Sequence, residues 1–372
     1  MLTIGIDAGT SKWAISVLEE YKEKGKTKTK FKFETTIPTK EVKSNVNALI
    51  NLIENFNADC ITLPSGYGLP LKHISELNDD DLFKISFKNK DEKESIGIRK
   101  FLSEAKKRKF NGYIIPSVKH LPTVENFKKV NVVDLGTSDK LCSAVYALSL
   151  SKNFKAEKII LAEIGYGFNA FLKICDGKIC DGIGGTIASS GFLAHGRTDS
   201  EINWNADKFS GGVLSILKSR SILKSHSISN SFEIHGQSER NSEVMIKQKG
   251  ATEEFFENYK NIENGNLAYN YFIDGIIKDI SALSDSKISK IYLCGKISGF
   301  VESEIKEGLE RKFERIFVTK NIEKNVKGTN WSSASRGGAI LANGINKGKF
   351  KNLTDWMEIK DAKGDIFDYV FV

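Results

Sequence analysis

One pattern occurs twice in this sequence, and the two copies lie 156 residues apart. Each copy has an apolar strand that ends in an acidic residue, an x-Gly turn, a returning strand, a second turn and a third strand. The residues that coincide after the shift are Asp7 with Glu163, Gly9 with Gly165, and Ala14 with Ala170. A supersecondary unit repeated in this order predicts a duplicated lobe.

The remaining segments alternate between helical and strand patterns. The strands predicted within the two copies cover residues 2–7, 12–18, 29–37, 159–163, 168–175 and 178–182. Further strands are predicted at 60–63, 112–115, 130–133 and 290–294, and helices at 95–109, 140–150, 255–283, 302–313 and 333–346. This alternation indicates an α/β fold.

The length of the chain suits two lobes. It has 372 residues, of which 40% are apolar and 10% aromatic, enough to fill two cores. We predict an N-terminal lobe over residues 1–150 and a C-terminal lobe over 151–372. The polar, serine-rich stretch 197–249 fits neither copy of the pattern, so it is interpreted as an insertion in the second lobe.

The basic excess does not indicate nucleic-acid binding. Lys and Arg number 55 against 47 Asp and Glu, and a solvated hairpin loop accounts for the six lysines between residues 21 and 32. No zinc-finger, RRM-type or helix-turn-helix motif accompanies the charge. The sequence has no apolar run of 18 residues, no signal-peptide pattern and no CxxC pair among its five cysteines. We therefore expect a cytoplasmic protein that binds neither nucleic acid nor membrane.

The two glycine turns predict a site for phosphate groups. A tight turn after an acidic residue directs backbone N–H groups and hydroxyls outward together, and such turns form nests that bind anions. In the first turn the candidate phosphate ligands are Gly9, Thr10, Ser11 and Lys12. Asp7 would repel a phosphate, so its predicted role is to orient water molecules on Mg²⁺.

These segments resemble motifs of the actin, sugar-kinase and heat-shock ATPase superfamily. Residues 4–12 are similar to its first phosphate motif, 163–167 to its second, 291–295 to its adenosine strand, and 336–340 to the start of its last connecting helix. The resemblance implies two ribonuclease-H-like (actin-like ATPase) lobes, each with a mixed five-stranded sheet and flanking helices, and Mg·ATP between them. It also implies nucleotide contacts from Glu163, Gly165, Tyr166, Gly167, Gly295, Lys296, Gly337 and Gly338.

Within this superfamily the chain most resembles an archaeal group of butyrate-kinase-like proteins. Residues 134–139 are similar to the paired aspartates that precede the second lobe of butyrate kinases, and 181–186 to the stretch after their second phosphate loop. Acyl kinases usually carry Asn-x-Gly-Ser in the first motif, where this chain has Asp7-Ala8-Gly9-Thr10, and histidine in place of Glu163. The resemblance therefore supports the fold and the nucleotide site better than an acyl substrate.

Four side chains are candidates for the chemistry itself. Asp139 is the first candidate for a catalytic base or a second Mg²⁺ partner, and Asp134 is the second candidate. The alternative for each is a structural aspartate at a helix N-cap or in a turn. A carboxylate acceptor needs a cationic group facing the γ-phosphate, because two anions must be brought together. His120 and Arg197 are the candidates, and a solvated or structural loop residue is the alternative for each.

Three functions stay open at this point. The first is a Mg·ATP-dependent kinase of butyrate- or acetate-kinase type that forms an acyl phosphate, with a sugar kinase as a variant in which Asp139 is the base. The second is an ATPase that drives a protein partner, and the third is a nucleotide-binding scaffold. Asp7, Asp139 and both glycine turns argue against the scaffold, so we predict a kinase for a small molecule. The prediction allows a homodimer.

Overall fold

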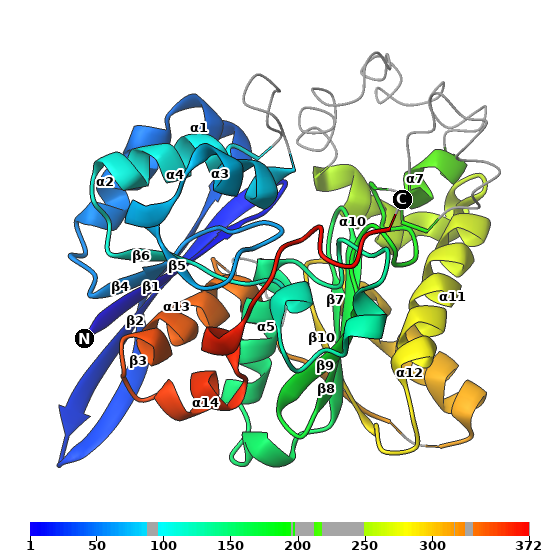
Figure 1. Cartoon of the computed structure of the whole chain (residues 1–372). Helices are drawn as coiled ribbons and strands as arrows, with labels where there is room; N and C mark the ends of the chain where they lie inside the picture. Colours follow the sequence, from blue (N-terminus) through cyan, green and yellow to red (C-terminus); the bar gives the residue numbers. More distant parts are fainter. Residues whose placement is uncertain are drawn as a thin grey trace.

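The computed structural model describes residues 1–87, 96–194, 196–197, 212–217, 249–315, 317–323 and 330–371. Two mixed sheets stand side by side, each with helices packed against it (Figure 1). The α/β class with two sheet-and-helix lobes is therefore confirmed. Most of the predicted insertion, 197–249, lies outside the described residues, which include only residue 197, residues 212–217 and residue 249 of it.

The first sheet has six strands in the order β3-β2-β1-β4-β6-β5. Their bounds are β1 (Leu2–Ala8), β2 (Lys12–Glu23), β3 (Lys26–Pro38), β4 (Cys60–Thr62), β5 (Lys72–His73) and β6 (Gly112–Ile114). The first three form the predicted antiparallel meander, and β4 runs parallel to β1. The sixth strand, β5, adds to the five that were predicted; its two residues are too few to leave an alternating pattern.

The helices of the first lobe are short. They are α1 (Thr39–Ser44), α2 (Val46–Glu54), α3 (Asp79–Ser86) and α4 (Ile98–Lys107), with 3₁₀ turns η1 (Ile74–Glu76), η2 (Val118–His120) and η3 (Asn126–Lys129). The strand predicted at 130–133 is wrong, because these residues form a turn after η3 in which Asn131 has a φ of +53°. That left-handed conformation is incompatible with an extended strand.

The second sheet has five strands, as predicted, in the order β11-β10-β7-β8-β9. Their bounds are β7 (Ile159–Ile164), β8 (Asn169–Cys175), β9 (Lys178–Ile183), β10 (Lys290–Cys294) and β11 (Val318–Asn321). Strands β7, β8 and β9 repeat the antiparallel meander of the first sheet. The pairing of Asp7 with Ala14 in the first meander matches that of Glu163 with Ala170 in the second, so the repeat seen in the sequence is confirmed.

The helices of the second lobe lie mainly on the side of its sheet that faces away from the first lobe (Figure 1). They are α7 (Gly212–Leu217), α10 (Lys249–Asn258), α11 (Gly265–Leu283) and α12 (Ser298–Phe313), with 3₁₀ turns η4 (Phe154–Ala156) and η6 (Tyr259–Asn261). The helix predicted at 255–283 is thus interrupted between α10 and α11, where Asn264 has a φ of +57°. In the described residues, no helix is long and apolar enough to cross a membrane.

Helices α5 (Ser138–Ser149) and α13 (Ser333–Ile345) pack against each other between the two sheets, and α14 (Lys351–Trp356) and η7 (Ile359–Asp361) follow α13. Although it lies near the end of the chain, α13 packs against β1 (Figure 1). Gly5 allows this close approach, because a Cβ there would lie 2.1 Å from the carbonyl oxygen of Ser335. The end of the chain therefore contributes to the core of the first sheet.

Gly337→Ala is expected to destabilise the protein by about 2–4 kcal/mol. A Cβ at this position of α13 would lie 1.7 Å from the carbonyl oxygen of Cys142 in α5, and backbone atoms cannot move aside cheaply. Gly308→Ala in α12 is the matched control, since its Cβ would meet only the flexible end of the Ile277 side chain. Thermal melting should separate the two variants; equal melting temperatures would contradict this packing role.

Candidate functional site

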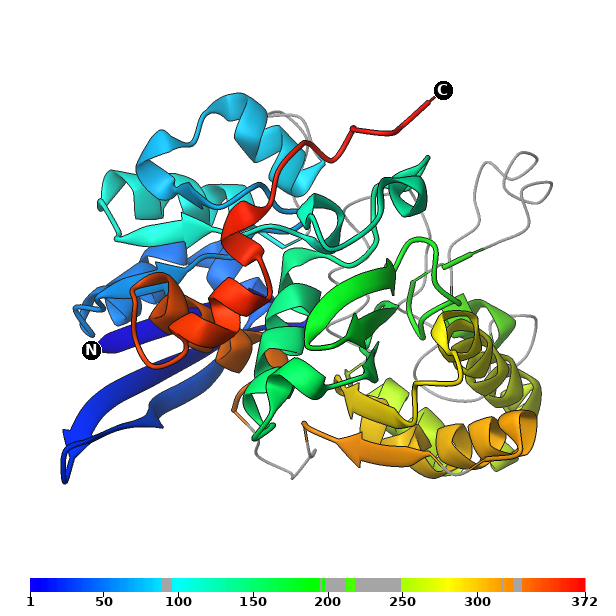
Figure 2. The same cartoon turned by 60° about the horizontal axis from the view of Figure 1, so that its bottom comes forward.

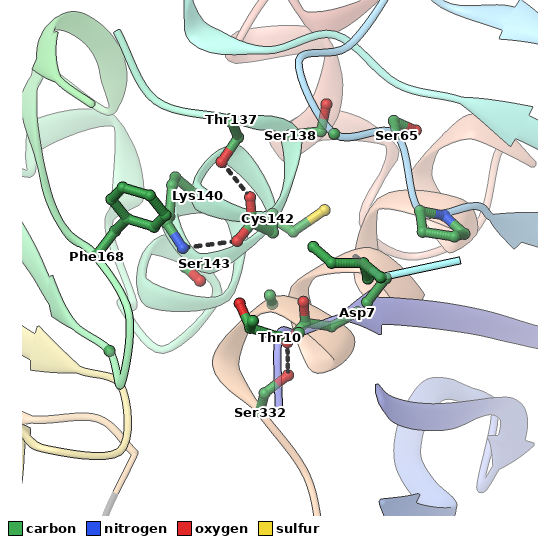
Figure 3. A pocket seen from close by; sticks show the side chains of 18 of the residues that line it. Asp7, Thr10, Ser65, Thr137, Ser138, Lys140, Cys142, Ser143, Phe168 and Ser332 are labelled. Carbon is green, nitrogen blue, oxygen red and sulfur yellow. Dashed lines mark hydrogen bonds and ion pairs between the residues drawn. The ribbon is translucent and has the colours of Figure 1, made fainter. Parts of the chain in front are cut away.

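A cavity of about 380 Å³ lies between the two lobes (Figure 3). Its walls come from the turns after β1 and β7, the start of α5, and the segments that precede α12 and α13. This volume is typical of small-molecule sites. The sequence-predicted residues that line it are Asp7, Gly9, Thr10, Ser11, Lys12, Asp134, Asp139, Glu163, Gly165, Tyr166, Gly167, Gly295 and Lys296.

The two glycine turns have the same construction. A Cβ on Gly9 would lie 2.6 Å from the carbonyl oxygen of Lys12, and one on Gly165 would lie 3.0 Å from that of Phe168. The first turn is therefore too tight for a larger residue, and in the second turn the neighbouring backbone would have to shift slightly to admit one. Thr39 also fixes the first turn, because its hydroxyl donates a 2.7 Å hydrogen bond to the carbonyl oxygen of Gly9. Both turns border the same cavity, one from each lobe.

Lys140, at the start of α5, joins two carboxylates of the cavity. Its Nζ lies 2.6 Å from Oδ2 of Asp139 and 2.5 Å from Oε1 of Glu163. The hydroxyl of Ser143 donates a 2.9 Å hydrogen bond to Oε2 of Glu163, and that of Thr137 donates to Asp139. Sequence reasoning did not identify Lys140; its position beside Asp139 on the first turn of a predicted helix was the available signal.

Among the described residues, Asp7 has no ion-pair partner within 4.0 Å, although the charge of the nearby Lys140 acts on it. Its Oδ2 accepts a 2.7 Å hydrogen bond from the hydroxyl of Ser332, another residue that the sequence did not indicate (Figure 3). Burial and the neighbouring Asp139 and Glu163 carboxylates raise the pKa of Asp7 to about 7. A divalent cation beside Asp7 would relieve this repulsion, so the carboxylates present suit Mg²⁺.

The pKa of Asp139 changes in the opposite direction. Burial alone would raise it, but the Lys140 ammonium and the hydrogen bonds from Lys140 and Thr137 hold the pKa of Asp139 below its usual value. Asp139 is therefore ionised in the physiological range. Within the described residues, no three His, Cys, Asp or Glu side chains converge as a metal cluster. Mg²⁺ is commonly held by one or two carboxylates together with phosphate and water, and Asp7 and Asp139 are two carboxylates that line this cavity.

Stability without nucleotide should decrease as the pH rises from 5 to 8. The pKa of Asp7 is about 7 in the folded protein against 3.8 for the free side chain, so the folded state binds more protons in this range and loses stability as they dissociate. We expect Asp7→Asn to raise the stability at pH 8 by on the order of 1–3 kcal/mol and to change it less at pH 5. Thermal melts of this variant and of the exposed Asp361→Asn test this; identical pH profiles of the two would contradict it.

Two of the predicted catalytic residues have structural contacts. Oδ1 of Asp134 accepts a 2.9 Å hydrogen bond from the backbone N–H of Gly136, and its carbonyl accepts one of 3.2 Å from Gly184, so it holds a turn at the cavity wall. Arg197 does not line the cavity: its Nη2 lies 2.9 Å from Oδ1 of Asp279, which is fully buried. Arg197 therefore holds a loop of the second lobe in place.

The other predicted residues outside the cavity are His120, Gly337 and Gly338. His120 lines a second cavity. Gly337 and Gly338 bring α13 close to α5 and β1, since a Cβ on Gly338 would lie 3.0 Å from Cα of Gly5. At the central cavity, Lys296 contacts Glu253, with an Nζ to Oε1 distance of 3.3 Å, and lies over the ring of Tyr166.

A family model described as "Protein of unknown function (DUF1464)" matches residues 5–372. The chain belongs to this family. No curated protein matches this member of the DUF1464 family.

Several solved structures are similar in fold to this DUF1464 member. A propionate kinase from Francisella tularensis subsp. tularensis has a TM-score of 0.50 at 12% identity, covering 90% of this chain and 98% of that one. An acetate kinase from Entamoeba histolytica has a TM-score of 0.49 at 14% identity, covering 84% of this chain and 86% of that one. A ROK family glucokinase from Streptomyces griseus, in complex with glucose and AMPPNP, has a TM-score of 0.47 at 13% identity, covering 92% of this chain and 99% of that one. The likeness to the propionate kinase confirms the predicted fold of the actin, sugar-kinase and heat-shock ATPase superfamily.

Proposed function

We propose that this protein is a Mg·ATP-dependent phosphotransferase that acts on a small carboxylate and forms an acyl phosphate. The observation that carries the proposal is the meeting of two glycine turns, one from each lobe, with Asp7, Asp139 and Glu163 around one cavity. Phosphoryl transfer requires mainly positioning and charge stabilisation, which such an arrangement supplies. The butyrate-kinase-like relation predicted from the sequence is part of this proposal.

The position of each residue in the central cavity suggests which part of Mg·ATP it contacts. The backbone N–H groups of residues 9–12 and of Tyr166 and Gly167 bind the phosphates, since that of Gly165 donates to the carbonyl oxygen of Phe168 within its own turn. Gly295 and Lys296, which line the same cavity, are the residues that we propose to contact the nucleoside. Asp7 and Asp139 would hold Mg²⁺, directly or through water. When bound, this ion neutralises charge on the transferred phosphoryl group.

The state of Asp139 favours a carboxylate acceptor. An aspartate paired with Lys140 at 2.6 Å and with a lowered pKa is a weak proton acceptor. A sugar hydroxyl requires an effective proton acceptor before it can attack, whereas a carboxylate is already ionised at pH 7 and requires none. Because His120 and Arg197 lie outside the cavity, Lys12 and Lys296, which line it, become the candidates that offset the repulsion between the two anions.

A screen of acceptors tests this function. The purified protein is incubated with Mg·ATP and either short carboxylic acids or sugars, and hydroxylamine traps any acyl phosphate as a hydroxamate. We expect ADP and hydroxamate to form together with at least one carboxylic acid, and neither to form in the Asp7→Ala variant. ATP hydrolysis stimulated only by sugars would favour a sugar kinase, and stimulation only by another protein would favour a partner-driven ATPase.

A further inference from the structure

A second cavity, of about 440 Å³, lies away from the first, beside η2 and η3. The C-terminal segment closes one side of it, and Figure 2 shows this segment, in red, passing beside the chain that contains η2 and η3. Two backbone hydrogen bonds hold the segment there, from Lys363 N to His120 O (2.9 Å) and from Asn131 N to Tyr369 O (2.8 Å). The cavity is therefore built by two segments far apart in the sequence.

Two buried lysines line this cavity. Lys119 and Lys129 are only 2% and 6% exposed. Each Nζ has a backbone carbonyl as its acceptor, that of Ile366 at 2.5 Å for Lys119 and that of Leu121 at 3.0 Å for Lys129. Among the described residues, no carboxylate oxygen lies within 4.0 Å of either Nζ. Burial lowers the pKa of both lysines, and the Asp368 carboxylate, which acts on both from beyond 4.0 Å, offsets this only in part, as does Asp365 for Lys119.

His120 adds a third donor. It is 2% exposed, and its Nδ1 lies 3.0 Å from the hydroxyl oxygen of Ser117 and 3.3 Å from the backbone N of the same residue, whose N–H can only donate. Because Nδ1 accepts, the proton of the neutral ring is on Nε2. Burial and the nearby Lys119 and Lys129 lower the pKa of His120 to about 4, so the ring is neutral at pH 7. Among the described residues, the buried Nε2 atom has no hydrogen-bond partner, which leaves an N–H donor without an acceptor.

The acidic residues at the rim have other partners. Oδ2 of Asp365 lies 2.5 Å from Nζ of Lys84, and its Oδ1 accepts a 3.0 Å hydrogen bond from the backbone N–H of Phe367. Oδ2 of Asp368 accepts a 2.9 Å hydrogen bond from the backbone N–H of Asp365. Both carboxylates therefore hold the C-terminal segment in its turn, and the exposed Lys363 adds a further cation to the rim.

We infer that this second cavity is a binding site for a small phosphate-bearing anion, held by Lys119, Lys129 and His120. All three side chains present N–H donors, and a phosphate group supplies several acceptor oxygens with the charge that two buried lysines require. The cavity is larger than one phosphate group needs, so we expect a phosphomonoester rather than the free ion. The inference does not depend on the function proposed for the central cavity.

The test follows the His120 side chain directly. The full chain, labelled with ¹⁵N at histidine, is titrated with inorganic phosphate and separately with glycerol 3-phosphate. We expect a saturable shift of the His120 Nε2–H resonance, identified by its loss in His120→Gln, at lower concentrations of glycerol 3-phosphate. Tighter binding of inorganic phosphate would overturn the expectation of a phosphomonoester, and a His120 resonance that does not move with either probe would overturn the site.

Calorimetry with matched variants separates this site from the central cavity. Lys129→Met and His120→Leu should weaken glycerol 3-phosphate binding at least about tenfold, whereas His120→Gln, which keeps an N–H donor, should retain most of it. Lys128→Met is the control, because the neighbouring Lys128 pairs with Asp181 and does not line the cavity. Lys12→Met changes only the central cavity and should leave this binding unchanged. Equal losses in Lys128→Met and Lys129→Met would show a general charge effect and overturn the inference.

Discussion

Asp7→Ala is expected to lower Mg·ATP turnover by about a thousandfold or more without unfolding the protein. Asp7 lies next to the last residue of β1 at the cavity, and its pKa is raised to about 7 by burial and by Asp139 and Glu163. Lys140 pairs with Asp139 and Glu163 but leaves the pKa of Asp7 raised, so a further cation beside Asp7 would relieve the remaining repulsion. Removing Asp7 removes the predicted ligand of that cation and leaves the β1 pairing intact.

Steady-state turnover, Mg²⁺ titration and thermal melting together check this result. Ser332→Ala is the matched control, because it keeps the Asp7 carboxylate and removes its 2.7 Å hydrogen bond, together with the 3.0 Å hydrogen bond that the Ser332 hydroxyl accepts from the backbone N–H of Ser335 at the start of α13. We expect a much smaller loss of turnover in this variant, with the Mg²⁺ requirement retained. Full turnover in Asp7→Ala with an unchanged melting temperature would remove this cavity as the catalytic site.

Asp139→Asn is expected to lower turnover by about a hundredfold while changing nucleotide affinity far less. The Asp139 carboxylate is an ion paired with Lys140, and it lines the cavity between the two glycine turns. The amide keeps the shape of the side chain and leaves Lys140 paired with Glu163 at 2.5 Å. The substitution removes one negative charge at the position proposed for Mg²⁺. This loss should affect turnover more than nucleotide binding, because the charge on the phosphoryl group is redistributed in the transition state.

Single-turnover rates and nucleotide binding by calorimetry separate the two effects. Asp134→Asn is the comparison, since Asp134 is buried and accepts from the backbone of Gly136, so it should affect stability more than turnover. An unchanged rate in Asp139→Asn would exclude Asp139 from the mechanism. Equal losses of turnover in both variants would mean that Asp139, like Asp134, has a structural role.

Most strands and helices were predictable because their patterns are local. An alternating or apolar run is visible within a few residues. The repeat placed β1 and β7 in equivalent positions, and it correctly matched the pair Asp7 and Ala14 to the pair Glu163 and Ala170. The prediction was wrong at residues 130–133, where apolar character is present but Asn131 adopts a left-handed conformation. Strand β11 was missed because its four residues carry no distinctive pattern.

The candidate site was predictable only in part. The glycine turns and the acidic residues at the strand ends were found, because their chemistry is contained in a few adjacent residues. Ser332 and Asp7 are 325 residues apart in the chain, so no local pattern connects them. His120 and Arg197 were predicted to face the nucleotide from charge alone, but the direction of a loop side chain depends on what packs around it, and both lie outside the cavity.

Local sequence patterns were enough to predict the duplicated meander, the two tight glycine turns and an acidic residue near the end of β1 and of β7, since all of these depend on short-range periodicity and on the conformational freedom of glycine. The packed chain was needed to show that Lys140 joins Asp139 to Glu163, that Asp7 keeps a raised pKa beside them, and that the C-terminal segment closes a second cavity over Lys119 and Lys129. These features depend on desolvation and on pairing between distant segments, which arise only when the chain is packed.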